Sequence, residues 1–284
     1  MGNQTRIDWA DSTWNPVTGC LHGCEYCYAR RIAERFAGCD KASTFSVNCQ
    51  ATWKRVNPES NREDAIFEVY EKCPPINIRF DAKTQKEIHT IAPYPFGFQP
   101  TLRRDKLEEP ASWKKPRTIF VCSMADLFGD WVPDEWIKRV FDACEAAQQH
   151  RYLFLTKNPK RYITLIKNGV IKADKPNFWL GSTTTNPEME YFWHSKVNTF
   201  VSIEPILEPF TGIVDEGVNP ESGTNWIIVG AETGNRKNKV VPKKEWVMEL
   251  VECARLTNTP IFMKESLRTI MGEDFCQEFP WSPI

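Results

Sequence analysis

The strongest constraint on the fold is a series of short apolar segments in the middle of the chain. Five of them are almost uninterrupted by polar residues: RTIFVCSM (117–124), RYLFLTK (151–157), NFWLGST (177–183), TFVSIEP (199–205) and WIIVGAET (226–233). Continuous apolar runs of this length are typical of strands that are buried on both faces of a parallel sheet. Weaker runs at 13–18 and 260–266 bring the number of predicted strands to seven.

Segments with helical spacing of apolar residues separate these runs. The clearest are residues 133–149, 159–169 and 242–257, and each begins with a proline at its first position. Repeated strand-then-helix units predict an α/β fold, here a partial TIM-like (β/α) barrel with parallel strands. A chain of 284 residues can form such a barrel as one domain, so we expect a single barrel domain over residues 1–284.

Residues 40–116 break this rhythm because they are rich in turn-forming and charged residues. We expect an irregular insertion on one face of the barrel, with 40–95 as its main part. Two roles stay open for this insertion: a lid that contacts the substrate, or a surface loop with a small hairpin of its own.

Composition limits the class of protein and its compartment. The formal net charge is −1, with 36 basic and 37 acidic residues, which argues against a protein that coats DNA. No apolar run is long enough to span a bilayer, and the first residues lack the apolar core of a secretion signal. We therefore expect a cytoplasmic protein without a membrane partner. In that compartment the ten cysteines are expected to be reduced thiols or metal ligands rather than disulfides.

Three of these cysteines, Cys20, Cys24 and Cys27, have the spacing C-x3-C-x2-C. At the cysteine frequency of this chain the pattern would arise by chance roughly 0.01 times per sequence. Thiolates are ligands that zinc and iron–sulfur clusters share. Three thiolates on one tight loop can hold three irons of a 4Fe–4S cluster and leave the fourth iron open to a cofactor or substrate.

The residues around the cysteines suit a negatively charged cluster. Gly19 and Gly23 allow the backbone to bend and to bring amide groups toward sulfur. A helix predicted to start near Tyr28 would direct its positive end toward the same place.

The motif C-x3-C-x-(aromatic)-C, with Tyr26 in the aromatic position, resembles that of the radical S-adenosylmethionine (radical SAM) superfamily. The rest of the chain resembles its phage-associated three-cysteine branch, whose function is largely unassigned. The matching landmarks are TWNPVTGC, CYA, FVCSMADLFGDWVPDEW, LTKNP, WLGST, VSIEPIL, VGAETG and MKE. They cover residues 7–38 and 96–266, whereas 40–95 does not map onto the branch.

This resemblance implies a cofactor chemistry and a place for it. A 4Fe–4S cluster would lie at the carboxyl ends of the strands, with SAM chelating the open iron through its amino and carboxylate groups. Reductive cleavage of SAM would give methionine and a 5′-deoxyadenosyl radical, which abstracts hydrogen from an unassigned substrate. A reductant such as flavodoxin or ferredoxin would supply the electron. Our best guess for the substrate is a nucleotide, a modified nucleobase or nucleic acid; a peptide or small metabolite is the alternative.

Barrel geometry independently points to polar residues at the carboxyl ends of the strands. We expect Tyr26, Lys157 and Ser202 to bind the cofactor, Ser123 and Asp126 to lie near the methionine end of SAM, and Ser182 and Glu204 near its ribose or amino group. Glu232 and Lys264 are the candidate catalytic residues near the substrate. Further polar residues at these ends are Thr156, Thr183, Thr233 and Glu265. For each residue taken singly, a turn or capping role is an equally good interpretation.

One landmark of the wider superfamily is missing. Many radical SAM enzymes hold the SAM amino group with Gly-Gly-Glu after the second strand, where this chain has CSMADLF. The nearest similar segment, VGAETG, comes four strands later. SAM contacts therefore cannot be transferred from the superfamily by position.

Other interpretations of the cysteines remain open. A zinc site would need a fourth ligand from His22, Cys39, Cys49 or Cys73, and the last three could instead hold a second cluster. We expect His22 to point to solvent or to pack near the cluster edge. The other alternative is a zinc-binding or nucleic-acid-binding phage or defence protein without SAM chemistry. Its support is the mixture of aromatic and basic residues in WKRVN, TLRRDK and SWKKPR. Cys122, Cys144 and Cys253 have apolar neighbours and are expected to pack in the core.

Overall fold

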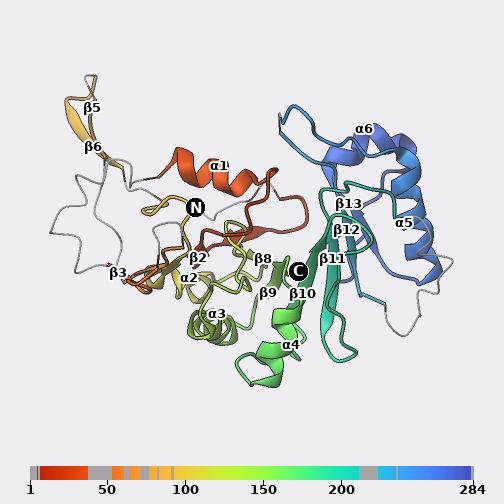
Figure 1. Cartoon of the computed structure of the whole chain (residues 1–284), viewed down its shortest axis with the longest axis horizontal. Helices are drawn as coiled ribbons and strands as arrows, with labels where there is room; N and C mark the ends of the chain where they lie inside the picture. Colours follow the sequence, from red (N-terminus) through yellow and green to blue (C-terminus); the bar gives the residue numbers. More distant parts are fainter. Residues whose placement is uncertain are drawn as a thin grey trace.

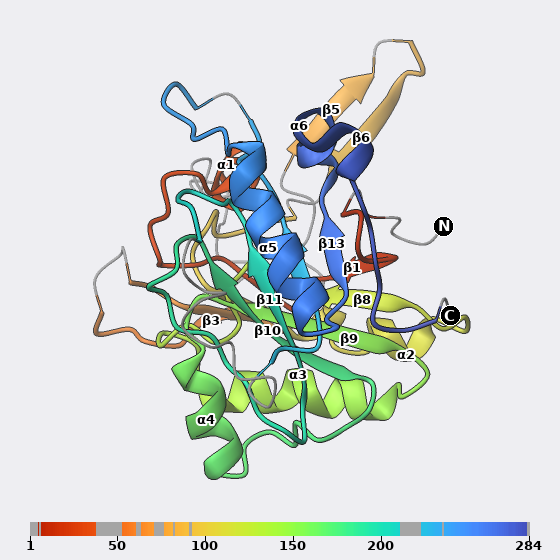
Figure 2. The same cartoon turned by 90° about the vertical axis from the view of Figure 1, so that its right-hand side faces the viewer.

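The computed structural model of the chain describes residue 5 and residues 7–37, 53–60, 64–70, 77–81, 83–90, 93–210, 223–234 and 236–282. Its largest element is a seven-stranded sheet in which all neighbouring strands are parallel. The sheet curls into a half-barrel (Figures 1 and 2). In spatial order its strands are β1 (Ser12–Trp14), β8 (Thr118–Val121), β9 (Arg151–Thr156), β10 (Phe178–Thr184), β11 (Asn198–Ile203), β12 (Ile227–Val229) and β13 (Ile261–Met263).

Helices cover the outer face of this half-barrel. The three longest are α3 (Asp134–Ala146), α4 (Lys160–Lys167) and α5 (Lys244–Leu256), close to the segments that the sequence predicts. Each follows a strand and packs back on the sheet, as parallel connections require (Figure 2). Shorter helical turns follow β13: η5 (Glu265–Leu267), α6 (Arg268–Met271) and η6 (Gly272–Asp274). The expected fold class, a partial TIM-like barrel, is confirmed.

Both faces of the sheet are buried, which explains why the strand segments are so continuously apolar. Outward-facing residues such as Val121 and Phe154 pack with α3 and α4 in one core cluster. Inward-facing residues alternate with them, and Phe120, Leu153 and Phe200 pack with Trp9 and Trp226 inside the half-barrel. The inner cluster fills the half-barrel below the carboxyl ends of the strands.

The expected first strand, residues 13–18, is divided between two sheets. β1 joins the half-barrel, whereas β2 (Val17–Thr18) pairs antiparallel with β7 (Thr101–Arg103) in a smaller sheet. The break falls at Pro16, which has no backbone N–H to donate. Asn15 beside it accepts a hydrogen bond from the Met124 amide at 2.9 Å through its side-chain oxygen, which holds the bend against the end of β8.

The described part of the insertion is more regular than the sequence suggests. The small sheet has the order β2-β7-β4-β3, with β3 at Trp53–Arg55 and β4 at Phe67–Val69. β5 (Asn77–Asp81) and β6 (Lys86–Thr90) form a separate antiparallel hairpin that stands apart from this sheet (Figure 1). The turn η3 (Arg104–Lys106) and the short helix α2 (Glu109–Ser112) lead back to the half-barrel. Ile66 and Leu102 share a core cluster with residues of β1 and β2, so the small sheet packs directly on the half-barrel.

Among the helices of the described ranges, none combines the length and the apolar character needed to cross a membrane.

Candidate cofactor site at the carboxyl ends of the strands

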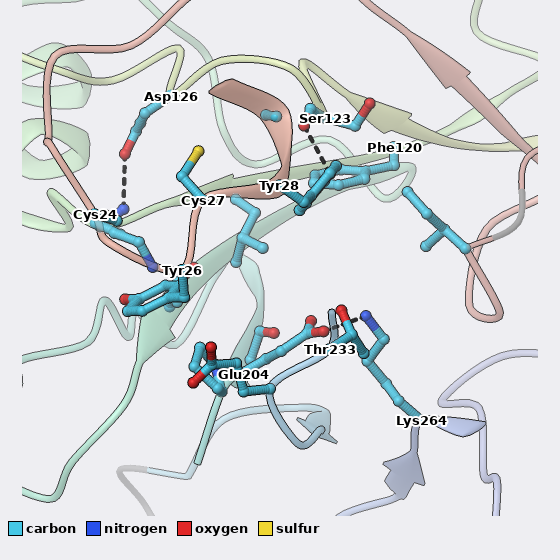
Figure 3. Close-up of a pocket in the computed structure, with 18 of the residues that line it drawn as sticks. Cys24, Tyr26, Cys27, Tyr28, Phe120, Ser123, Asp126, Glu204, Thr233 and Lys264 are labelled. Carbon is cyan, nitrogen blue, oxygen red and sulfur yellow. Dashed lines mark hydrogen bonds and ion pairs between the residues drawn. The ribbon is translucent and has the colours of Figure 1, made fainter. Parts of the chain in front are cut away.

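A cavity of about 600 Å³ opens at the carboxyl ends of the half-barrel strands (Figure 3). Its walls come from the segment before β1, from the loop between β2 and α1 (Tyr28–Arg35), and from the ends of β8 to β13. All but one of the predicted site residues line it: Cys20, Cys24, Tyr26, Cys27, Ser123, Asp126, Lys157, Ser202, Glu204, Glu232 and Lys264. Thr156, Thr183, Thr233 and Glu265 line it as well.

Ser182 is the exception. Its side chain is fully buried, and its hydroxyl accepts a hydrogen bond of 2.8 Å from the Phe192 amide. Successive residues of a strand face opposite sides of the sheet, so Thr183, and not Ser182, reaches the cavity. In this structure Ser182 therefore holds the backbone at Phe192 and does not line the cavity.

The loop that carries the cysteines, residues 19–27, is fixed at its start by backbone contacts. Gly19 donates to the Met124 carbonyl at 2.9 Å, and Cys20 donates to the Phe98 carbonyl at 3.1 Å. Gly19 has a φ of +87°, and a Cβ atom there would lie 2.2 Å from the Gln99 carbonyl oxygen. Only glycine satisfies both conditions, because it tolerates this φ and leaves room for the neighbouring backbone.

The end of the loop is fixed by helix α1. Cys27 is the N-cap residue of α1, and its sulfur accepts a hydrogen bond of 3.3 Å from the Arg30 amide. The predicted helix start near Tyr28 is therefore confirmed. Unpaired amides at a helix start favour negative charge, so the Cys27 position suits a thiolate.

The three thiols face one cavity and are half-buried in the free protein. Burial, with a smaller contribution from the nearby Asp126, Cys27 and Cys24, raises the pKa of Cys20 to about 12. In the described part of the chain, no group of three His, Cys, Asp or Glu side chains already has a metal-binding arrangement. The thiols would therefore have to turn toward a common centre and lose their protons when a metal binds. The donor set itself, three soft sulfur atoms on one loop, fits an iron–sulfur cluster.

Asp126 is the most heavily bonded side chain at the cavity. One carboxylate oxygen accepts from the Thr156 hydroxyl at 2.7 Å and the Phe128 amide at 3.0 Å. The other accepts from the Lys157 amide at 2.9 Å and contacts His22 Nε2 at 2.7 Å. These four contacts fix the carboxylate at the cavity wall, so Asp126 positions the site, and its place near the methionine end of SAM stays a prediction.

His22 does not point to solvent. Besides its contact with Asp126, its ring packs edge-on against Trp131, with 4.9 Å between the ring centroids. The Asp126 contact uses Nε2 and leaves Nδ1 as the ring nitrogen that could bind a metal, so the zinc alternative with His22 as fourth ligand stays open. The other candidates, Cys39, Cys49 and Cys73, lie outside the described residues, as does any second cluster that they would hold.

Two charged side chains line the cavity next to the cysteine loop. Lys157 lies over the Tyr26 ring, with its Nζ 5.5 Å from the ring centroid. Glu232 forms two hydrogen bonds of 2.7 Å with Arg236, which also reaches Glu25 of the cysteine loop at 3.6 Å. Arg236 lowers the pKa of Glu232, so this carboxylate is charged at neutral pH.

Several residues that shape the cavity were not predicted from the sequence. Asn15 holds the end of β8, Arg236 neutralises Glu232, and Gly230 leaves space for a pair of charged side chains. Trp9 closes the inner end of the cavity. Asn15 and Gly230 fall within quoted landmarks, but a single sequence does not show which landmark residues bear contacts.

Fold and site together define an α/β half-barrel protein with a three-cysteine loop at the open end of its sheet. The chain belongs to the family DUF5131, described as a protein of unknown function, whose family model matches residues 4–73 and 71–269. No curated protein and no solved structure matches the chain.

Proposed function

We propose that the chain is a radical SAM enzyme. The observation that carries this proposal is that Cys20, Cys24 and Cys27 line one cavity together with the polar residues at the strand ends. This combination supplies three soft ligands and, next to them, space and hydrogen-bonding groups for a cofactor and a substrate. When bound, the 4Fe–4S cluster would supply the electron that cleaves SAM to methionine and a 5′-deoxyadenosyl radical, which takes hydrogen from the substrate.

The residues of the chain have separate tasks in this proposal. Cys20, Cys24 and Cys27 would hold the cluster. Trp9, Phe120 and Leu155 form an apolar part of the cavity wall, which would limit the access of water to a reactive intermediate. Lys157 offers a hydrogen-bond donor to the cofactor, and Ser202 offers one to the substrate. We further propose that the protein works in the cytoplasm and receives its electron from a flavodoxin or a ferredoxin.

The test is anaerobic reconstitution of the purified chain with iron and sulfide, followed by addition of dithionite and SAM. We expect about four irons per chain, a brown protein and release of 5′-deoxyadenosine. Cys20→Ser, Cys24→Ser and Cys27→Ser should each abolish SAM cleavage. Cys276→Ser is the matched control, because Cys276 is also half-buried but does not line the cavity. A chain that bound only zinc and never cleaved SAM would refute the proposal.

A further inference from the structure

We propose that Glu204, Lys264 and Ser202 form the substrate subsite, and that they bind the lactam edge of a nucleobase or nucleoside. A lactam edge presents a carbonyl oxygen beside a ring N–H. This inference rests on the proposed function and deepens it, because it names the substrate class and the residues that recognise it.

The ion pair between Lys264 and Glu204 is built across a glycine. Glu204 follows β11 and Lys264 follows β13, and the strand between them leads to Gly230. A Cβ atom at Gly230 would lie 2.9 Å from Lys264 Cδ and 3.2 Å from Glu204 Cγ. Glycine at this position therefore lets the two side chains meet over the end of β12 and face the cavity (Figure 3).

The pair retains hydrogen-bonding capacity on its cavity side. Lys264 Nζ contacts Glu204 Oε1, and the described residues provide no hydrogen-bond partner for Glu204 Oε2. An ammonium group has three donors, so Lys264 can also donate to a ligand. The two side chains thus offer a donor beside an acceptor, which complements the carbonyl and N–H of a lactam edge.

Ser202 adds a third polar group on the same wall. It lies near the end of β11, two residues before Glu204, and both residues line the cavity. Its side chain is fully buried and lines the cavity, yet its hydroxyl has no hydrogen-bond partner among the described residues. Because an unpaired buried hydroxyl is costly, this position indicates a ligand group that bonds to it.

The remaining cavity wall suits a flat, uncharged ring system. Trp9 and Phe120 present aromatic surface, and Leu155 adds an aliphatic face. The cavity has no surplus of positive charge, since its acids outnumber its lysines. Arg236 and Arg268 outside the lining only neutralise Glu232 and Glu265. The acidic lining residues are Asp8, Asp126, Glu204, Glu232 and Glu265, and the lysines are Lys157 and Lys264. A phosphate would be poorly placed here, which favours a base or nucleoside over a nucleotide.

The subsite is separate from the thiols. Figure 3 shows Cys24 and Cys27 on one side of the cavity and Glu204 and Lys264 on the other. In the sheet, β11 and β13 are also several strands away from the edge strand β1 that leads to the cysteine loop. A ligand bound to the ion pair therefore need not compete with ligands of the cysteines.

The test measures binding to the metal-free chain, so that it does not depend on cluster assembly. Inosine and uridine carry a lactam edge, whereas purine riboside has the ring system of inosine without the carbonyl or the N–H. By titration calorimetry we expect inosine or uridine to bind about tenfold or more tightly than purine riboside. Glu204→Gln and Lys264→Met should each remove this preference, and Ser202→Ala should weaken lactam binding several-fold.

Two controls keep the outcome interpretable. Lys138→Met breaks an exposed ion pair with Asp142 on α3, away from the cavity, and should change no affinity. S-adenosylhomocysteine reports on the cofactor side, and its affinity should be the same in all variants. The proposal is overturned if purine riboside binds as tightly as inosine, or if neither inosine nor uridine binds at millimolar concentration. It is also overturned if the Glu204, Lys264 and Ser202 variants lose as much affinity for S-adenosylhomocysteine as for the lactam ligands. SAM cleavage by the reconstituted enzyme is scored separately, so the two proposals can fail independently.

Discussion

Asp126 and His22 join the cysteine loop to the half-barrel through a contact of 2.7 Å between Oδ2 and Nε2. His22 lies between Cys20 and Cys24, whereas Asp126 follows β8 and is bonded to the end of β9. The orientation of the loop is thus set by a carboxylate that belongs to the sheet. A rigid attachment of this kind is what a three-ligand site needs, because three ligands alone leave a metal cluster weakly held.

Removal of the Asp126 side chain should mainly lower stability, whereas removal of the His22 side chain should mainly lower iron binding. Asp126→Ala leaves the Thr156 hydroxyl and the Phe128 and Lys157 amides without their acceptor, so we expect a loss of about 2–5 kcal/mol in the free energy of unfolding. His22→Ala should change stability by about 1 kcal/mol or less, but it should lower the iron bound per chain after reconstitution. Urea titration of the metal-free protein and iron analysis measure the two effects.

His194 provides the matched control for His22, since it is exposed and does not line the cavity. His194→Ala should leave both stability and iron content unchanged. If His22→Ala bound as much iron as the unmodified chain, the positioning role of the pair would be wrong.

The two glycines of the cysteine loop should differ in their tolerance of alanine. Both have positive φ, +87° at Gly19 and +70° at Gly23. A Cβ atom at Gly19 would collide with the Gln99 backbone, whereas one at Gly23 would meet nothing within 4 Å. Gly23→Ala should therefore cost only the strain of a left-handed residue, about 1–2 kcal/mol. Gly19→Ala should cost clearly more, because the loop must also move.

Unfolding midpoints of the two variants in urea give the comparison directly. Equal destabilisation by Gly19→Ala and Gly23→Ala would contradict the close approach of Gly19 to Gln99. Iron content provides a second readout, which should fall further for Gly19→Ala because the displaced loop carries all three thiols.

The half-barrel could be predicted because its signal is local and repeated. The runs 117–124 and 151–157 each have four consecutive apolar residues at their centre, 119–122 and 152–155, as expected for a sheet covered on both faces. The small sheet could not be predicted in the same way. Its strands have three residues or fewer among the described ones and pair across long stretches of sequence, so neither periodicity nor length distinguishes them from loops.

The site was predictable in its position but not in its bonding. Barrel geometry correctly brings Lys157, Glu204 and Lys264 to one cavity. Whether a side chain faces the cavity or the surrounding protein depends on which face of the strand it occupies. Ser182 and Thr183 are neighbours on β10, yet only Thr183 lines the cavity. Asp126 shows the same limit, because its partners come from three separate segments and no spacing rule connects them.

Glu68 should hold the insertion to the half-barrel. This carboxylate of β4 is almost fully buried and contacts Arg104, Lys54 at 3.1 Å and Arg139 of α3 at 3.7 Å. Glu68→Gln would remove the negative charge that faces all three cations, although Arg139 keeps Glu135, so we expect a loss of about 1–3 kcal/mol on urea unfolding. Glu135→Gln also removes a partner of Arg139, but that carboxylate is exposed, and the loss should be below about 1 kcal/mol. Equal effects of the two variants would show that the buried carboxylate has no special role.

His150 should make stability depend on pH. Its ring is buried, Nε2 contacts the Pro110 carbonyl at 2.9 Å, and Nδ1 has no partner among the described residues. Burial lowers the pKa of His150 from its ordinary value of 6.5. The unfolded chain therefore takes up this proton more readily than the folded chain, so the stabilisation is complete above pH 6.5 and is lost as pH falls through the lower folded-state pKa. Urea unfolding between pH 5 and pH 8 should show unmodified protein losing stability relative to His150→Gln at the acid end. His194→Gln, a change at an exposed histidine, should keep the slope of the unmodified chain. Parallel stability curves for His150→Gln and the unmodified protein would rule out this titration.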